Sequence, residues 1–277
     1  MTSRLNFLQQ SAMGLAGTLS VPLVSAAAPE VKGAVALNTG IAGYTFAKFD
    51  LEKAIAMMKK VNINYLSIKD IHLPLNSSQE KIDSVKKQLA DAGINVYAVG
   101  VIYMKTKEAV DEAFAYAKKV GVPLIVGVPN PELLDHTESV VKATGIRIAI
   151  HNHGPEDKLY PGPANVMELI KGRDPRMGLC LDIGHAIRAG ADPATAVKLY
   201  KDRIFDLHIK DVTLAQKDGK AIELGRGVID FGALVKALQK IKYQGICALE
   251  FEKDMSDPLA GIAESAGFYH GVVKTLS

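Results

Sequence analysis

The sequence contains no tryptophan, few aromatic residues and only two cysteines. Of its 277 residues, 48% are hydrophobic and 23% are charged, which is typical of an α/β protein and argues against disorder or a coiled coil. Cys180 and Cys247 lie in apolar runs that we assign to non-neighbouring units, and a disulfide needs Cα atoms within about 7 Å. We therefore expect two buried free thiols.

Long apolar runs and a strong charge are also missing. No apolar stretch reaches the roughly 20 residues that a membrane-spanning helix needs. The net charge is +3, and no run rich in Lys and Arg is flanked by aromatic residues. We expect neither a membrane span nor a nucleic-acid partner.

The N-terminal segment differs in composition from the rest of the chain. Arg4 is its only charged residue before Glu30, residues 12–24 are small and apolar, and a run of small residues follows. This pattern predicts an export signal over residues 1–28 and hence a periplasmic protein, with one TIM-barrel catalytic domain over residues 29–277. A loose N-terminal helix on a cytoplasmic enzyme is the alternative, and the export route stays open.

Strand-like apolar runs alternate with segments of helical periodicity along the chain. The predicted strands are Ala34 to Leu37, Tyr65 to Ile68, Val96 to Val101, Leu124 to Val128, Arg147 to Ile150, Leu179 to Leu181, Ile204 to Ile209 and Ile246 to Phe251. Eight strand–helix units predict a closed (β/α)8 barrel of the TIM type. An open doubly wound sheet is the alternative, but no Gly-x-Gly-x-x-Gly turn follows the first strand, which disfavours a dinucleotide-binding version.

Four residues of metal-binding types stand at the ends of late strand-like runs. They are His151, Asp182, His208 and Glu250. Their spacing approximates the roughly 30 residues of one strand-plus-helix unit, and the carboxyl ends of barrel strands converge at one mouth. Taken singly, each residue could belong to a hydrogen-bonded polar layer. Together they predict a site for one divalent cation, and their ligand types suit Mn, Zn, Co and Fe alike.

The run from Phe205 to Lys210 alternates apolar and polar residues, so that Asp206, His208 and Lys210 share one face. Helices cover the outside of such a barrel and bury the apolar face. The polar face must therefore point into the barrel, where ionised groups are costly unless they are paired or bound to a metal.

The segments around these four residues resemble the metal shell of the xylose isomerase-like sugar isomerase/epimerase barrels. They read Ile-His-Asn-His-Gly, Leu-Asp-Ile-Gly-His, Leu-His-Ile-Lys-Asp and Ala-Leu-Glu-Phe-Glu, and the resemblance covers about residues 34–275. It implies a TIM barrel and a divalent metal that polarises the carbonyl and hydroxyl of a sugar and stabilises an enediolate. It also implies that glutamates such as Glu250 serve as ligand and as acid or base.

His151 departs from the family pattern, since many members have Glu at this position. An imidazole lowers the negative charge of the ligand set and should make the cation a stronger Lewis acid. It also removes one candidate proton shuttle. Enolisation by a single base, or enolisation followed by loss of a β-leaving group, becomes more plausible than symmetrical two-glutamate epimerisation.

Two further catalytic candidates accompany Glu250. His153 shares a face with His151 and could act as acid or base, or only hold a ligand by a hydrogen bond. Lys210 could stabilise an enolate oxygen, carry a lowered pKa near the cation, or pair with a neighbouring carboxylate. The candidate substrate-binding residues are His185, Arg226, His72, Lys69 and Glu252.

Three hypotheses about function remain open. The first is a metal-dependent sugar isomerase or epimerase; the second is a lyase or hydratase that eliminates from a keto-glycoside; the third is a non-catalytic carbohydrate-binding barrel. All three expect a small-molecule carbohydrate partner. A metal-dependent abasic-site endonuclease is disfavoured because Tyr103 and the loop from Thr213 to Glu223 supply no histidine for a three-zinc cluster. Metal identity, stereochemistry and oligomeric state stay open.

Overall fold

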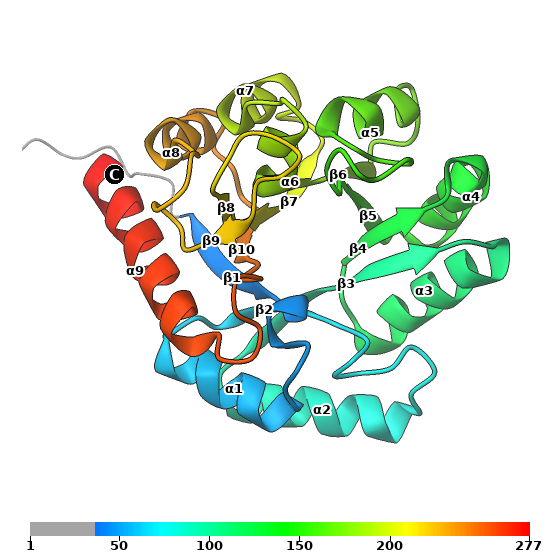
Figure 1. Cartoon of the computed structure of the whole chain (residues 1–277). Helices are drawn as coiled ribbons and strands as arrows, with labels where there is room; N and C mark the ends of the chain where they lie inside the picture. Colours follow the sequence, from blue (N-terminus) through cyan, green and yellow to red (C-terminus); the bar gives the residue numbers. More distant parts are fainter. Residues whose placement is uncertain (1–36) are drawn as a thin grey trace, which may run out of the picture. The chain divides into compact units, whose positions relative to one another are not determined.

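The computed structural model describes residues 37–277, and the predicted export signal over residues 1–28 lies outside them. The barrel strands are β1 Asn38–Ala42, β2 Tyr65–Ile68, β3 Asn95–Met104, β4 Leu124–Pro129, β5 Arg147–His151, β6 Met177–Asp182, β7 Ile204–Ile209 and β10 Ile246–Leu249. They are parallel and close in the order β1-β10-β7-β6-β5-β4-β3-β2 (Figure 1). The predicted (β/α)8 barrel is confirmed, and the open sheet is excluded.

Helices surround the barrel (Figure 1). They are α1 Leu51–Lys60, α2 Gln79–Asp91, α3 Lys107–Val120, α4 Leu134–Thr144, α5 Pro163–Leu169, α6 Ile183–Arg188, α7 Pro193–Leu199, α8 Phe231–Lys240 and α9 Leu259–Leu276, with the short 3-10 helices η1 Gly43–Phe46 and η2 Pro131–Leu133. Several begin at a capping side chain that accepts a backbone N–H, as Asp50 does for α1 and Thr106 for α3. Among the described residues, no helix is long and apolar enough to cross a membrane.

The first strand was predicted too early in the chain. The apolar run Ala34 to Leu37 suggested it, whereas β1 begins at Asn38, and residues 34–36 lie outside the described part. Parallel pairing with β10, and not local hydropathy, sets its position. In this pairing Gly40 lies opposite Ala248. A Cβ on Gly40 would come within 2.6 Å of Ile246 Cγ2, so this register requires glycine there.

The connection between β7 and α8 carries an antiparallel hairpin of β8 Asp211–Val212 and β9 Ala221–Ile222. The Asp211 carboxylate accepts the backbone N–H groups of Gly225, Gly227 and Ile229 and ties the rest of this connection to β8. The loop is therefore ordered by one buried carboxylate and not by apolar packing alone.

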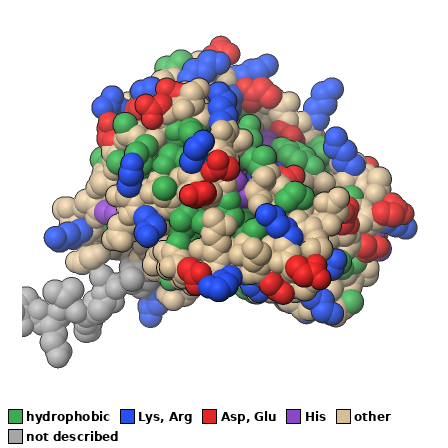
Figure 2. Space-filling view, turned by 90° about the horizontal axis from the view of Figure 1, so that it is seen from below, with side chains coloured by type: hydrophobic (Ala, Val, Ile, Leu, Met, Phe, Trp, Pro, Cys, Tyr) green, Lys and Arg blue, Asp and Glu red, His purple; other side chains and the backbone are tan. Residues whose placement is uncertain are grey.

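The two cysteines are free and buried, as predicted, and β7 separates the strands that carry them. On the face that Figure 2 shows, Lys and Arg side chains are interspersed with Asp and Glu, and hydrophobic side chains form small patches between them. That face presents no single-sign field of the kind that binds nucleic acid.

Candidate metal centre and active site

Four polar side chains from four adjacent strands converge inside the barrel mouth. His151 ends β5, Asp182 ends β6, His208 lies in β7 and Glu250 follows β10. All four are buried, and one ligand atom of each lies within 4.8 Å of the others. The structure thus brings together the four residues that the sequence nominated as ligands.

The separations inside this cluster suit ligands around a single ion. His151 Nε2 lies 3.1 Å from His208 Nδ1 and 3.5 Å from Asp182 Oδ2, and His208 Nδ1 lies 3.3 Å from Glu250 Oε2. Atoms that each bind one ion at about 2.1 Å lie roughly 3.0 to 3.4 Å apart. Among the described residues, the second ring nitrogens, His151 Nδ1 and His208 Nε2, are buried with no hydrogen-bond partner, and Asp182 Oδ2 has only the Lys210 ammonium and the His151 and His185 imidazoles near it. This donor set fits a divalent cation.

Cys180 offers a second possible grouping with His151 and His208. Burial raises the pKa of its thiol to about 12. The set with two carboxylates offers four donors in place of three, and its carboxylates are ionised without help from a metal, so it is the better candidate.

Lys210 places a positive charge beside the cluster. Its Nζ lies 3.0 Å from Asp182 Oδ2, 2.7 Å from Glu250 Oε2 and 2.9 Å from Glu252 Oε2. Burial acts to lower the pKa of Lys210, but these three carboxylates outweigh it and hold the pKa well above its ordinary value. Lys210 is therefore a fixed cation, which suits stabilisation of negative charge better than proton abstraction.

Asp182 is positioned by the turn into α6. Its Oδ1 accepts the backbone N–H of His185 at 2.8 Å and caps the helix. Asn152 holds the backbone of Asp182, accepting from its N–H at 3.0 Å and donating to its carbonyl at 3.1 Å. Gly184 leaves room for Lys210, because a Cβ there would lie 2.4 Å from Lys210 Cγ. The Asp-Ile-Gly-His segment thus positions both the carboxylate and the lysine.

Two more histidines face the cluster. The ring of His153 lies 4.4 Å from that of His151 between centroids, and the ring of His185 lies 6.0 Å from it. The Tyr103 hydroxyl is 2.8 Å from His153 Nε2, while His153 Nδ1 is buried with no hydrogen-bond partner in the described chain. Burial lowers the pKa of His153 and lowers that of His185 to about 4, so both are neutral near pH 7. A neutral imidazole with a free nitrogen can exchange a proton with a ligand.

Of the predicted substrate-binding residues, the structure places His185 and Glu252 beside the cluster, while Arg226, His72 and Lys69 have partners outside it. Arg226 is more than half exposed and pairs with Glu264 of α9, with Nε–Oε1 at 2.5 Å and Nη2–Oε2 at 2.8 Å. His72 bonds the backbone carbonyl of Phe49 at 3.1 Å. Lys69 donates to the carbonyl of Val101 at 2.5 Å and pairs with Asp70. Their role in substrate binding stays a prediction.

Sequence reasoning did not assign roles to Asn152, Tyr103 or Asp206. Asn152 lies between two histidines, a position that favours a backbone clamp. Tyr103 is the last residue but one of β3, and its partner could not be known before the strands were placed side by side. Asp206 shares the inward face of β7. Its Oδ2 accepts a hydrogen bond from the Tyr97 hydroxyl at 3.1 Å and lies 3.9 Å from His208 Nε2. Burial raises the pKa of Asp206 to about 7.

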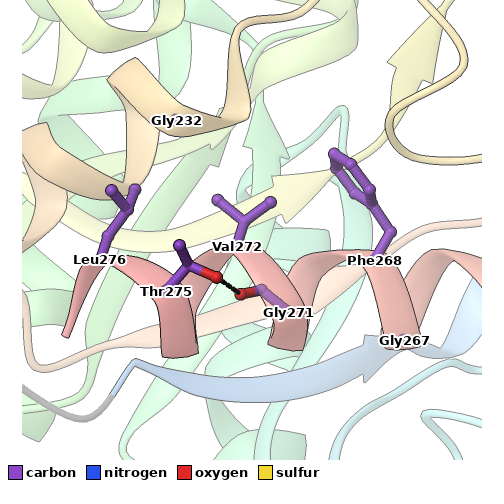
Figure 3. A pocket seen from close by; sticks show the side chains of 7 residues that line it. All are labelled: Gly232, Gly267, Phe268, Gly271, Val272, Thr275 and Leu276. Carbon is purple, nitrogen blue, oxygen red and sulfur yellow. Dashed lines mark hydrogen bonds between the residues drawn. The ribbon is translucent and has the colours of Figure 1, made fainter.

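A separate hollow of about 510 Å3 lies between the start of α8 and α9. Phe268, Val272 and Leu276 extend from α9 toward Gly232 (Figure 3). None of the residues that line it carries an ionisable or metal-binding group. This hollow therefore offers no acid, base or metal ligand.

The chain belongs to the xylose isomerase-like TIM barrel family, whose model matches residues 58–270. Among curated relatives, an inosose dehydratase of Bacillus cereus (strain AH820) is 27% identical over 137 residues, which cover 44% of this chain and 45% of that protein. The chain therefore matches less than half the length of this relative.

Solved structures agree with the fold. A protein of Parabacteroides distasonis ATCC 8503 superposes with a TM-score of 0.66 at 26% identity, over 85% of this chain and 98% of that one. The IOLI protein with a bound zinc atom superposes with a TM-score of 0.72 at 17% identity, over 87% of this chain and 99% of that one. An L-ribulose 3-epimerase superposes with a TM-score of 0.68 at 18% identity, over 87% of this chain and 96% of that one. At these identities the last two show a shared fold alone.

Proposed function

We propose that the chain is a divalent-metal-dependent sugar isomerase or epimerase that removes the proton next to a sugar carbonyl. The buried convergence of His151, Asp182, His208 and Glu250, with one possible ligand atom of each within 4.8 Å of the others, carries this proposal. A cation held by these residues would polarise the carbonyl and stabilise the negative charge of an enediolate. The zinc of the IOLI structure and the epimerase among the fold neighbours support it.

His153 is the proposed acid and base. Its free Nδ1 takes the proton from the carbon next to the carbonyl and delivers it to the former carbonyl carbon, while a hydroxyl proton moves between the two oxygens, which gives the isomeric sugar. Epimerisation would instead need a proton from a second donor on the opposite side of the same carbon. His153 Nε2 contacts the Tyr103 hydroxyl, through which a proton can reach solvent. Glu250 suits this task less well. Burial would raise its pKa, but Lys210 and His208 together hold the pKa well below its ordinary value. Lys210 stabilises the developing oxyanion.

A second candidate is a lyase acting on a keto-glycoside. The carbon next to the carbonyl loses a proton to the base, its electron pair forms a C=C bond, the bond to the β-oxygen breaks, and the departing alkoxide takes a proton. His151 favours this reading, because a second glutamate proton shuttle is missing at that position. The match to inosose dehydratases also supports it. We further propose that the reaction is periplasmic, on the composition of residues 1–28.

Solvent deuterium exchange tests the enolisation that both candidates share. The protein, supplied with Mn2+ or Zn2+ in deuterated buffer, is incubated with a panel of keto-sugars and keto-glycosides, and NMR follows label at the carbon next to the carbonyl. Incorporation into a remaining or epimeric sugar indicates isomerisation, and an ultraviolet-absorbing enone indicates elimination.

Matched histidine variants make the assignment specific. His153→Gln should slow exchange by about 10²- to 10⁴-fold, the usual contribution of general acid–base catalysis. His136→Gln, in α4 and paired with Asp111, serves as the control and should exchange as the wild type does. Absence of exchange with every sugar, in protein that has bound metal, would leave the carbohydrate-binding hypothesis in place of catalysis.

A further inference from the structure

The large hydrophobic side chains that remain exposed are concentrated at the barrel mouth. Among the described residues they are Tyr44, Ile71, Tyr103, Leu159, Leu214, Val228, Leu199 and Phe268. All but the last two lie at the carboxyl end of a strand or in the connection that follows it. A group of exposed apolar side chains around one opening marks a binding surface, whereas scattered single ones do not.

Two of these side chains are tyrosines whose backbone or hydroxyl is tied to the active site. Tyr44 precedes Thr45, whose hydroxyl donates to Leu249 O at 3.3 Å and accepts from Phe251 N at 3.0 Å. Leu249 and Phe251 flank Glu250, so η1 is fixed to the strand end that carries this predicted ligand. Tyr103 is fixed from the other side through its contact with His153.

Only β2 separates β1 from β3, and neighbouring strands lie about 5 Å apart, so the turn that carries Tyr44 and the strand that carries Tyr103 reach the same side of the barrel mouth. Burial raises the pKa of Tyr103, and so do the charges around it. Tyr44 and Tyr103 are nevertheless 40% and 53% exposed. The metal-binding candidates below them are at most 4% exposed. The tyrosines thus form an outer level above a buried reaction centre.

We propose that Tyr44 and Tyr103 form an aromatic subsite that binds a second ring of the substrate, so that the enzyme acts on glycosides in preference to free monosaccharides. The inference rests on the proposed function. A sugar bound at the cluster places its reacting carbons at the buried level, and a ring attached to it projects to the tyrosines. Tyrosine rings offer an apolar face and a polar hydroxyl, which match a ring that carries both C–H faces and hydroxyls.

Binding of two matched glycosides to the zinc-loaded protein tests this subsite. The probes are methyl β-D-glucopyranoside and 4-nitrophenyl β-D-glucopyranoside, which differ only in the group beyond the sugar. NMR titration should give a dissociation constant about 2- to 10-fold lower for the nitrophenyl glycoside, the range expected for one aromatic contact. Its aromatic protons should receive saturation from the protein.

Variants locate the contact. Tyr44→Ala and Tyr103→Ala should bring the ratio of the two dissociation constants toward one, while Tyr103→Phe, which keeps the ring and loses the hydroxyl, should retain most of it. Phe268→Ala removes an exposed aromatic ring remote from the mouth and should leave the ratio unchanged. A wild-type ratio of one, binding of neither probe, or a ratio that survives both alanine variants would overturn the subsite. Deuterium exchange judges the proposed function separately.

Discussion

At the scale of single residues, the site depends on small neighbours as much as on its charged groups. Asn152 holds the backbone of Asp182 by a hydrogen bond, and Gly184 leaves the space that the Lys210 side chain occupies. Asn152 and Gly184 themselves are not among the candidate ligands. Such supporting residues are hard to find in a sequence, because glycine and asparagine occur in many turns for other reasons.

Gly184→Ala tests this dependence. The added Cβ would meet Lys210 Cγ at 2.4 Å, so the lysine must leave its position between the carboxylates. Overpacking of this kind costs about 1–3 kcal/mol of the free energy of unfolding, measured by denaturant titration. Gly267→Ala in α9 is the matched control, since a Cβ there meets nothing within 4 Å, and it should be neutral or stabilising by up to about 1 kcal/mol. Equal effects of the two changes would refute the packing explanation.

The cysteines give a second prediction at this scale. Burial raises the thiol pKa of both Cys180 and Cys247 to about 12, so almost no thiolate exists near pH 8. Folded protein should react negligibly with a thiol reagent such as 5,5′-dithiobis(2-nitrobenzoate), and denatured protein should release two thiols per chain. Rapid reaction of the folded protein would show that one of these strands opens to solvent.

At the scale of elements, strand periodicity predicted the barrel well where both the apolar run and the pairing agree. β2 and β7 have the predicted bounds, and most other strands differ by one or two residues at an end. β1 was misplaced because Thr39 and Gly40 carry no strong apolar signal, and its register comes from β10, which lies far away in the sequence. The four candidate ligands were nominated from strand ends, whereas the Tyr103–His153 contact required the folded order of β3, β4 and β5.

The β7–α8 connection depends on Asp211. Its two oxygens accept backbone N–H groups from Gly225, Gly227 and Ile229. Asp211→Ala leaves these donors without their acceptor, which should cost about 1–3 kcal/mol in the free energy of unfolding. Hydrogen exchange should show faster amides across residues 225–229 in the variant. Asp230→Ala, which removes only the cap of α8, is the control and should leave those amides protected.

At the scale of the whole molecule, different halves of the barrel supply the candidate metal ligands and the tyrosines of the mouth. The candidate ligands come from the second half of the chain, β5 to the segment after β10, and the tyrosines of the mouth come from β3 and the turn after β1. Barrel closure brings these parts together, because β1 pairs with both β2 and β10. A conserved fold can thereby keep a metal centre on one side and vary the group that meets the substrate on the other.

Metal content of the purified protein is the decisive measurement. Elemental analysis should find about one divalent ion per chain after equilibration with Zn2+ or Mn2+ and removal of excess. His208→Ala should lose it, and His136→Ala, which changes a histidine of α4, should retain it. A wild-type protein that holds no ion, or a His208→Ala variant that holds as much as the wild type, would contradict the assignment of His151, Asp182, His208 and Glu250 as the metal centre.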